Sequence, residues 1–179
     1  MRDPHDAPVV RLARARSESA HADQKRDNGQ PYATHPAAVA RLLVERGVAD
    51  PTVLAAAYLH DVLEDTDADE STLRTEFGNE LVELVKELTN IGPTNRKFAE
   101  KQAALLEHAC EMSPQAKLIK LADRLHNLTE MKIWPEWKQK RYANASLELL
   151  EALRPWPDET LADDVHEVAV GYLSRRDES

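Results

Sequence analysis

The sequence contains few residues of several types, and each shortage excludes a class of protein. Its one cysteine, Cys110, excludes an internal disulfide and a cysteine-based zinc site, and it suits a reducing compartment. No stretch approaches the roughly 18 apolar residues of a membrane-spanning helix. The N-terminal segment MRDPHDAPVV is charged and interrupted by proline, without the apolar region of a secretory signal. We therefore expect a cytoplasmic protein that does not enter a membrane.

Basic residues are also scarce, and this bears on the partners that the protein can bind. The chain has 23 Lys and Arg against 32 Asp and Glu, a net charge of −9, so we expect no nucleic-acid binding through broad phosphate contacts. The charge is unevenly spread: residues 50–90 hold eleven acids and two bases, whereas residues 91–132 hold five acids and seven bases. The first block favours a multivalent cation, and the second favours a small polyanion.

Strand signals are absent, and helix signals are frequent. With five glycines and no sustained apolar–polar alternation, the sequence predicts an all-α fold. Asp50-Pro51 and Ser113-Pro114 are typical helix starts, and Gly47 is typical of a helix end. We expect one compact domain over residues 1–179, a bundle of about nine to ten helices. The segments expected to be helical are 7–25, 35–46, 51–64, 71–77, 79–89, 94–111, 114–131, 136–153 and 158–174.

The stretch LHDVLEDT, residues 59–66, follows the apolar run at residues 54–59 and contains four metal-ligating side chains. On a continuous helix at about 100° per residue, Glu64, Asp61 and Asp65 project within about 140° of His60. Three crowded carboxylates at a helix C-terminus repel one another, and a bound cation would relieve this. This segment alone is equally consistent with a solvated polar helix end and with a metal site.

Two further segments carry candidate ligands. In KLIKLADRLHNL, residues 117–128, Leu118, Leu121, Leu125 and Leu128 form a core stripe, and Asp123 lies opposite them, aligned with Lys120 and Asn127. In GQPYATHPAAVARLL, residues 29–43, His35 lies at a helix start. Taken in isolation, these residues suggest a surface aspartate paired with Lys120, and a capping or core histidine.

Taken together, PYATHP, LHDVLEDT and KLADRLHN, in this order and spacing, resemble the HD-domain hydrolase of the RelA/SpoT alarmone enzymes. More specifically, the chain resembles the stand-alone small alarmone hydrolases, similar to the metazoan and bacterial single-domain members. The resemblance runs from about residue 18 to about residue 150. The C-terminal helices, expected within 136–174, overlap the end of this range and extend beyond it. It implies an HD-domain phosphohydrolase fold. It also implies hydrolysis of the 3′-diphosphate of ppGpp or pppGpp to GDP or GTP and pyrophosphate, without synthesis.

The resemblance also implies the site residues. The family's metal ligands fall on His35, His60, Asp61 and Asp123, a mixed nitrogen and oxygen set that suits Mn²⁺ and does not exclude Fe²⁺, Co²⁺ or Zn²⁺. The following acidic pair of the motif falls on Glu64 and Asp65. We expect Glu64 to act as the general base or to orient water, and Asp65 to support the water or the leaving group; the two roles are interchangeable at this stage.

Positions expected to contact the nucleotide come from the same resemblance. Arg26 matches a position that packs on the base, Asn127 matches one that contacts the nucleotide, and the proposed phosphate partners are Lys97, Lys101 and Lys120.

One residue departs from the family pattern. Asp27 stands where the family often has a basic residue. This keeps a second function open, an HD phosphohydrolase acting on the 2′-phosphate of NADPH or on ppApp. A third function, a non-catalytic antitoxin or regulatory binder, is disfavoured because the motif residues are all present. Trp134 and Trp137 are expected either to pack the last helices or to fill a homodimer contact. The metal identity, the preferred nucleotide and the role of residues 150–179 stay open from the sequence.

Overall fold

The computed structural model describes residues 3–89 and 97–174. Within these ranges the chain forms ten α-helices and two short 3-10 helices, and the only strand-like pairing is one antiparallel bridge between Lys25 and Pro31. The predicted all-α fold is confirmed. The chain divides into two compact units, residues 1–91 and residues 92–179. Among the described helices, none combines the length and the apolar character that crossing a membrane requires.

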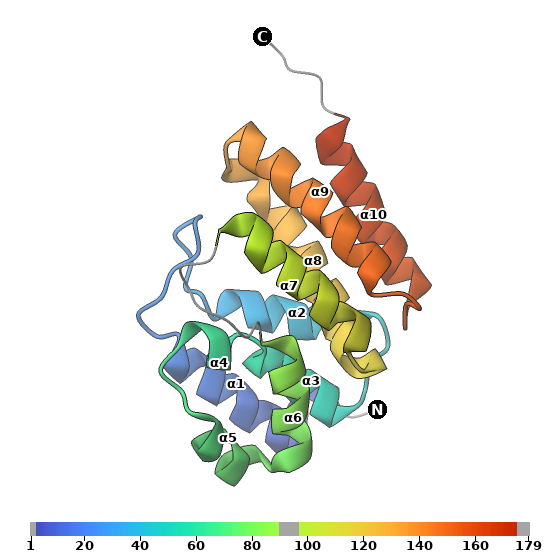
Figure 1. The fold of residues 1–179 in the computed structure, drawn as a ribbon. Coiled ribbons are helices and arrows are strands. Elements are labelled where there is room, and N and C mark those ends of the chain that lie inside the picture. The colour runs from blue at the N-terminus through green and yellow to red at the C-terminus, as the bar shows by residue number, and fades with distance from the viewer. Residues whose placement is uncertain (1–2, 90–96, 175–179) are drawn as a thin grey trace. The chain divides into compact units, whose positions relative to one another are not determined.

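The first unit is organised around α3, which has no polar face. Every residue from Val53 to Leu59 is buried, and α1, α2 and α6 pack against this helix (Figure 1). The elements of this unit are η1 (Pro4–Asp6), α1 (Pro8–Ala20), α2 (Thr34–Glu45), α3 (Pro51–Leu59), α4 (Val62–Asp65), α5 (Glu70–Phe77) and α6 (Asn79–Leu88). Because α3 is enclosed, the residue that directly follows it, His60, is also buried.

Several predicted helix boundaries are confirmed by their local contacts. The side chain of Asp50 caps α3 by accepting a hydrogen bond from the backbone N–H of Thr52 at 2.8 Å. Gly47, just past α2, has φ +84°, a left-handed conformation that glycine adopts without steric cost. Helix α2 was expected to begin at residue 35, but it begins at Thr34. Ala33 occupies the N-cap position, and the Thr34 hydroxyl donates to the carbonyl of Pro31 at 2.7 Å.

Two predicted helices are wrong in extent. The segment 7–25 was expected to be continuous, but α1 ends at Ala20, because the following chain folds back and Tyr32 donates its N–H to the carbonyl of Gln24 at 2.9 Å. The helix expected over 51–64 is interrupted after Leu59. Nδ1 of His60 lies 2.7 Å from the carbonyl oxygen of Ala57, the acceptor that a continuous helix would offer to the N–H of residue 61. The helix restarts as α4.

The second unit consists of α7 (Phe98–Glu111), α8 (Pro114–Glu130), η2 (Met131–Ile133), α9 (Glu136–Ala152) and α10 (Glu159–Leu173). Helix α10 packs against α8 and α9, and α7 packs against α9 (Figure 1). Leu121, Leu125 and Leu128 of the predicted stripe are buried, whereas Leu118 is half-buried. Residues 94–96 of the helix expected over 94–111 lie outside the described residues.

All three tryptophans of the chain belong to the second unit, at positions 134, 137 and 156. Trp134 lies edge-on to Tyr142, with 5.4 Å between ring centroids, and Lys138 Nζ lies 3.8 Å from its ring. Trp156 donates its indole N–H to the carbonyl of Leu150 at 2.7 Å. Trp137 is 62% exposed. Trp134 and Trp156 therefore pack within the last helices. For Trp134, this is the first of the two alternatives that were predicted.

Candidate metal centre

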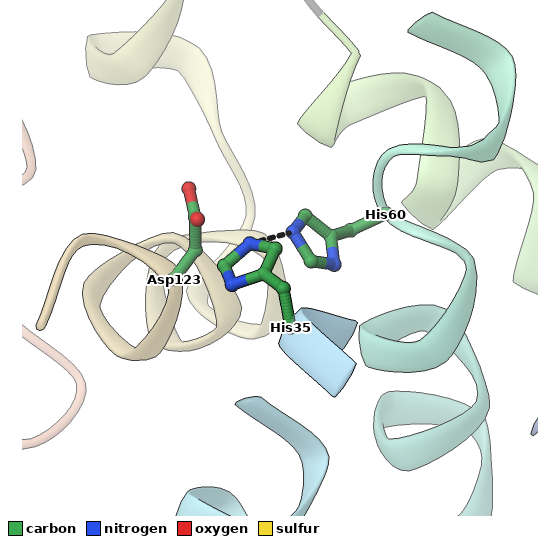
Figure 2. Close-up of side chains that lie close together, drawn as sticks. All are labelled: His35, His60 and Asp123. Atoms are coloured by element: carbon green, nitrogen blue, oxygen red, sulfur yellow. Dashed lines mark hydrogen bonds between the residues drawn. The ribbon is translucent and has the colours of Figure 1, made fainter. Parts of the chain in front are cut away.

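Two buried imidazoles meet in the first unit. His35 lies in the first turn of α2 and His60 directly follows α3, and each is 1% exposed. Their Nε2 atoms are 3.3 Å apart (Figure 2). Oδ2 of Asp61 lies 3.2 Å from Nε2 of His60 and 3.6 Å from Nε2 of His35. Three atoms that are able to bind a cation therefore converge from two separate segments of the chain.

The backbone fixes the protonation pattern of His60. The carbonyl oxygen of Ala57, 2.7 Å from Nδ1, only accepts hydrogen bonds, so Nδ1 carries the proton of the neutral ring. The lone pair of Nε2 then points toward His35 and Asp61. A histidine that donates its second ring N–H to a backbone carbonyl is the usual arrangement of a metal ligand.

The distances between these atoms fit a single divalent ion. Two neighbouring ligand atoms, each about 2.1 Å from one ion, are about 3.0 Å apart in octahedral and about 3.4 Å apart in tetrahedral coordination. The observed separations of 3.2, 3.3 and 3.6 Å are close to this range. A carboxylate among buried imidazoles also supplies negative charge that a cation would balance. The set therefore fits a divalent metal, although imidazole and carboxylate ligands do not select one metal among several.

Asp123 belongs to α8 in the second unit, where it is 8% exposed. Its Oδ1 accepts a hydrogen bond from the Asn127 side chain at 2.6 Å, and Lys120 Nζ lies 3.7 Å from its Oδ2. The predicted alignment of these three side chains along one face of α8 is thus present. Asp123 is buried rather than on the surface, and its two neighbours hold its carboxylate in a fixed direction.

Tyr32 is a site residue that the sequence reasoning did not assign. Its hydroxyl donates toward Oδ2 of Asp61 at 2.8 Å and toward Oδ2 of Asp65 at 3.0 Å. Burial is the largest cause that raises the pKa of Tyr32 above its usual value, and the negative charges of Asp61 and Asp65 raise it further. The hydroxyl therefore keeps its proton. The residue lies in the PYATHP motif, three positions before His35, but its contacts depend on how the helices are packed.

Glu64 and Asp65 are adjacent in α4 but have different surroundings. Partial removal of the Asp65 carboxyl from water is the largest cause that raises its pKa, and the charge of Asp61 raises it further. The hydrogen bond from Tyr32 opposes this only in part. Glu64 is exposed. Both line a cleft of about 500 Å³, together with Asp23 and Asp67. Four carboxylates would repel a polyphosphate, so this cleft is better suited to water or a cation.

The residues expected to contact a nucleotide are scattered over both units. Arg26 is half-buried, with its guanidinium carbon 5.7 Å from the centroid of the Tyr32 ring, and Asp27 is exposed in the same turn. Lys97 and Lys101 are exposed at the start of α7, whereas Lys120 is buried beside Asp123. Their roles toward a nucleotide stay predictions.

Two buried histidines, the second followed by Asp61 where a helix is interrupted, in an all-α fold, are the arrangement expected of an HD domain. The chain belongs to the HD-domain family, since a family model described as an HD domain matches residues 13–154. The resemblance predicted from the sequence is therefore confirmed. The match includes parts of both units, and the single-domain organisation stays a prediction.

The most informative relatives carry hydrolase names. The guanosine-3′,5′-bis(diphosphate) 3′-pyrophosphohydrolase MESH1 of Xenopus tropicalis is 36% identical over 157 residues, which cover 83% of this chain and 87% of that protein. The human protein of the same name is 37% identical over 142 residues, or 75% of this chain and 78% of the relative. A solved structure described as a metazoan orthologue of SpoT that hydrolyses ppGpp matches with a TM-score of 0.84 and 29% identity, over 92% of this chain and 96% of the other.

Other relatives are much longer. The chain spans 22% of the guanosine-3′,5′-bis(diphosphate) 3′-pyrophosphohydrolase of Aquifex aeolicus at 36% identity, and 19% of the probable GTP pyrophosphokinase of Mycobacterium leprae at 39% identity. It thus covers about a fifth of the length of these two relatives.

Proposed function

We propose that this chain is a metal-dependent hydrolase that removes the 3′-diphosphate of ppGpp or pppGpp, giving GDP or GTP and pyrophosphate. The observation that carries the proposal is the convergence of His35 Nε2, His60 Nε2 and Asp61 Oδ2 within 3.2–3.6 Å of one another. The names of the stand-alone relatives, which align with most of this chain, supply the substrate class.

His35, His60 and Asp61 would hold the metal, and we propose Asp123 as the fourth ligand on the basis of the family motif. We propose Mn²⁺ as the metal. Such a cation, when bound, polarises water and offsets the negative charge that builds on the phosphoryl oxygens.

The acidic pair performs the proton chemistry in this proposal. Glu64, which is exposed to the water of the cleft, takes the proton from the attacking water and thus acts as the general base. Asp65 is tied to Tyr32 and orients the water or the leaving group. Attack on the phosphorus attached to the 3′ oxygen breaks the bond to that oxygen, and the ribose 3′ oxygen then takes up a proton.

The proposed nucleotide contacts place positive charge on a chain with a net charge of −9. Arg26 packs on the base and Asn127 contacts the nucleotide, with Lys97, Lys101 and Lys120 as phosphate partners. Asp27, exposed next to Arg26, is the observation that favours a second candidate, an HD phosphohydrolase acting on NADPH or ppApp. The cytoplasmic location and the homodimer stay predictions.

The test is product analysis with ppGpp. The protein is incubated with ppGpp and Mn²⁺, and the products are separated by chromatography, with and without a chelator. We expect GDP and pyrophosphate, and we expect both to disappear after chelation and in His60→Ala. The matched control is His166→Ala, which removes an exposed imidazole on α10 and should keep full activity.

Because His60 is buried, a second variant keeps the test independent of folding. Glu64→Gln changes an exposed side chain, and loss of a general base should lower kcat by about 10²- to 10⁴-fold. If the wild-type protein binds Mn²⁺ but leaves ppGpp intact, the substrate assignment is wrong, and NADPH and ppApp are the next substrates. If none of the three is turned over, the non-catalytic binder is favoured.

A further inference from the structure

The hydroxyl of Tyr32 lies between two carboxylates that have different roles in the proposed reaction. It is 2.8 Å from Oδ2 of Asp61, a proposed metal ligand, and 3.0 Å from Oδ2 of Asp65, a proposed catalytic residue. The backbone of α4 sets the spacing of these two residues, since Asp65 N–H donates to the Asp61 carbonyl at 2.9 Å. It does not fix their side-chain directions. Like charges repel, so a donor between them is needed to hold both oxygens toward one point.

The ring that carries this hydroxyl is itself held in place. Tyr32 stacks on His21 with 4.6 Å between ring centroids and 27° between ring planes, and it lies edge-on to His35 at 6.0 Å. Its backbone N–H donates to the carbonyl of Gln24 at 2.9 Å. A tyrosine has two side-chain torsions, so a ring fixed on its face and at its backbone leaves the oxygen little freedom.

A second link joins the same segment to α4. The Gln24 side-chain amide donates to the backbone carbonyl of Asp65 at 2.6 Å, and its oxygen pairs with Nδ1 of His21 at 2.8 Å. Asp65 is therefore attached to the segment 24–32 at two points, through its carbonyl by Gln24 and through its carboxylate by Tyr32. Such a double attachment makes the direction of the Asp65 side chain a property of the loop as well as of α4.

We propose that Tyr32 is a positioning residue whose hydroxyl holds the metal-ligating carboxylate of Asp61 and the catalytic carboxylate of Asp65 in a fixed relation. This inference rests on the metal-dependent hydrolysis proposed above. Tyr32 acts through the two carboxylates and does not touch the reacting atoms.

The test variant is Tyr32→Phe, which keeps the ring on His21 and removes only the hydroxyl. The metal affinity of the metal-free protein is measured by calorimetric titration with Mn²⁺, in the absence of any nucleotide. Loss of a hydrogen bond to a ligating side chain should weaken Mn²⁺ binding by about 10- to 100-fold. At saturating Mn²⁺, kcat for ppGpp should fall by about 10-fold or more, whereas KM should stay within about two-fold of the wild-type value.

The control is Tyr58→Phe, which removes a phenol hydroxyl from the same unit. That hydroxyl contacts Nδ1 of His5 at 3.4 Å, and Tyr58 has no role in the proposed metal site or reaction. Its metal affinity and kcat should match those of the wild type. If Tyr32→Phe behaves like this control, the inference is wrong. It is also wrong if only KM rises, because Tyr32 would then contact the nucleotide. An inactive wild type overturns the proposed hydrolysis, but the calorimetric comparison still decides the role of Tyr32.

A second measurement applies if Tyr32→Phe fails to fold. The chain has four tyrosines, so incorporation of 3-fluorotyrosine gives four fluorine resonances, which Tyr→Phe variants at the other three positions assign. Addition of diamagnetic Zn²⁺ to the metal-free wild type should shift the Tyr32 resonance and leave that of Tyr58 in place. A Tyr32 resonance that does not move while Zn²⁺ binds would overturn the inference.

Discussion

At the scale of single residues, Asp65 shows how the site makes the metal-free protein sensitive to pH. Its pKa is raised by partial burial and by the charge of Asp61. Between the ordinary carboxyl pKa and this raised pKa, the folded chain therefore holds a proton that the unfolded chain has released. The contribution to stability is complete below the ordinary carboxyl pKa, and it is lost as the pH rises through the raised pKa. At neutral pH the ionised Asp65 therefore destabilises the metal-free fold.

We predict that Asp65→Asn raises the Tm of the metal-free protein at pH 7. The gain should shrink as the pH falls toward about 4, where the carboxyl of the wild type also becomes neutral. Thermal unfolding followed by circular dichroism at several pH values measures this. Asp67→Asn, which removes the same charge from an exposed position two residues away, is the control and should give a smaller change. A lower Tm for Asp65→Asn at pH 7 would mean that the bond to Tyr32 outweighs the cost of burial.

The resemblance to a known family identified the candidate ligands, but not how they are supported. His35, His60 and Asp61 were assigned because they fall on the metal-ligand positions of the family motif; residue chemistry alone favoured a capping or core histidine at position 35. Tyr32 was missed because a tyrosine before a helix has no distinctive spacing to Asp61, 29 positions away. His21 and Gln24 were missed for the same reason. These residues meet the site through the packing of α1, α3 and α4, which local sequence patterns do not encode.

At the scale of elements, three of the predicted helix starts lie at N-cap residues. Asp50, Ser113 and Asp158 each accept a hydrogen bond from a backbone N–H in the first turn of their helix. The interruption after Leu59 was not predictable from propensity. It arises from the buried side chain of His60, which takes the carbonyl of Ala57 from the helix. This same contact leaves Nε2 available to a metal, so the local irregularity and the ligand have one cause.

We predict that removing the cap of α8 weakens the protein measurably. Ser113 accepts from the backbone N–H of Ala116 at 3.2 Å, at the start of the helix that carries Asp123. Ser113→Ala should cost about 1 kcal/mol, which lowers Tm by roughly 2–4 °C. Ser113→Asp keeps an acceptor at this position, and it should retain most of the wild-type Tm. Equal losses in both variants would show that the hydroxyl does not act as a cap.

At the scale of the whole molecule, a bound cation should stabilise the fold. Mn²⁺ at a free concentration of 100 times its Kd should add about 2.7 kcal/mol to the free energy of unfolding. Differential scanning calorimetry with and without a chelator measures the change in Tm. His60→Gln should remove the shift, whereas His166→Gln, at an exposed position of α10, should keep it. A shift that persists in His60→Gln would place the cation elsewhere.

The distribution of tryptophan makes the two halves of the chain optically distinct. Because all three indoles belong to residues 92–179, tryptophan fluorescence, excited where tyrosine does not absorb, follows the second unit, whereas far-ultraviolet circular dichroism follows the helices of both. If the chain unfolds as the single domain that the sequence predicts, the two signals should change at the same denaturant concentration. If the fluorescence changes at another concentration, each unit is its own cooperative block. The protein therefore carries a built-in reporter of its own cooperativity, and no label is needed to read it.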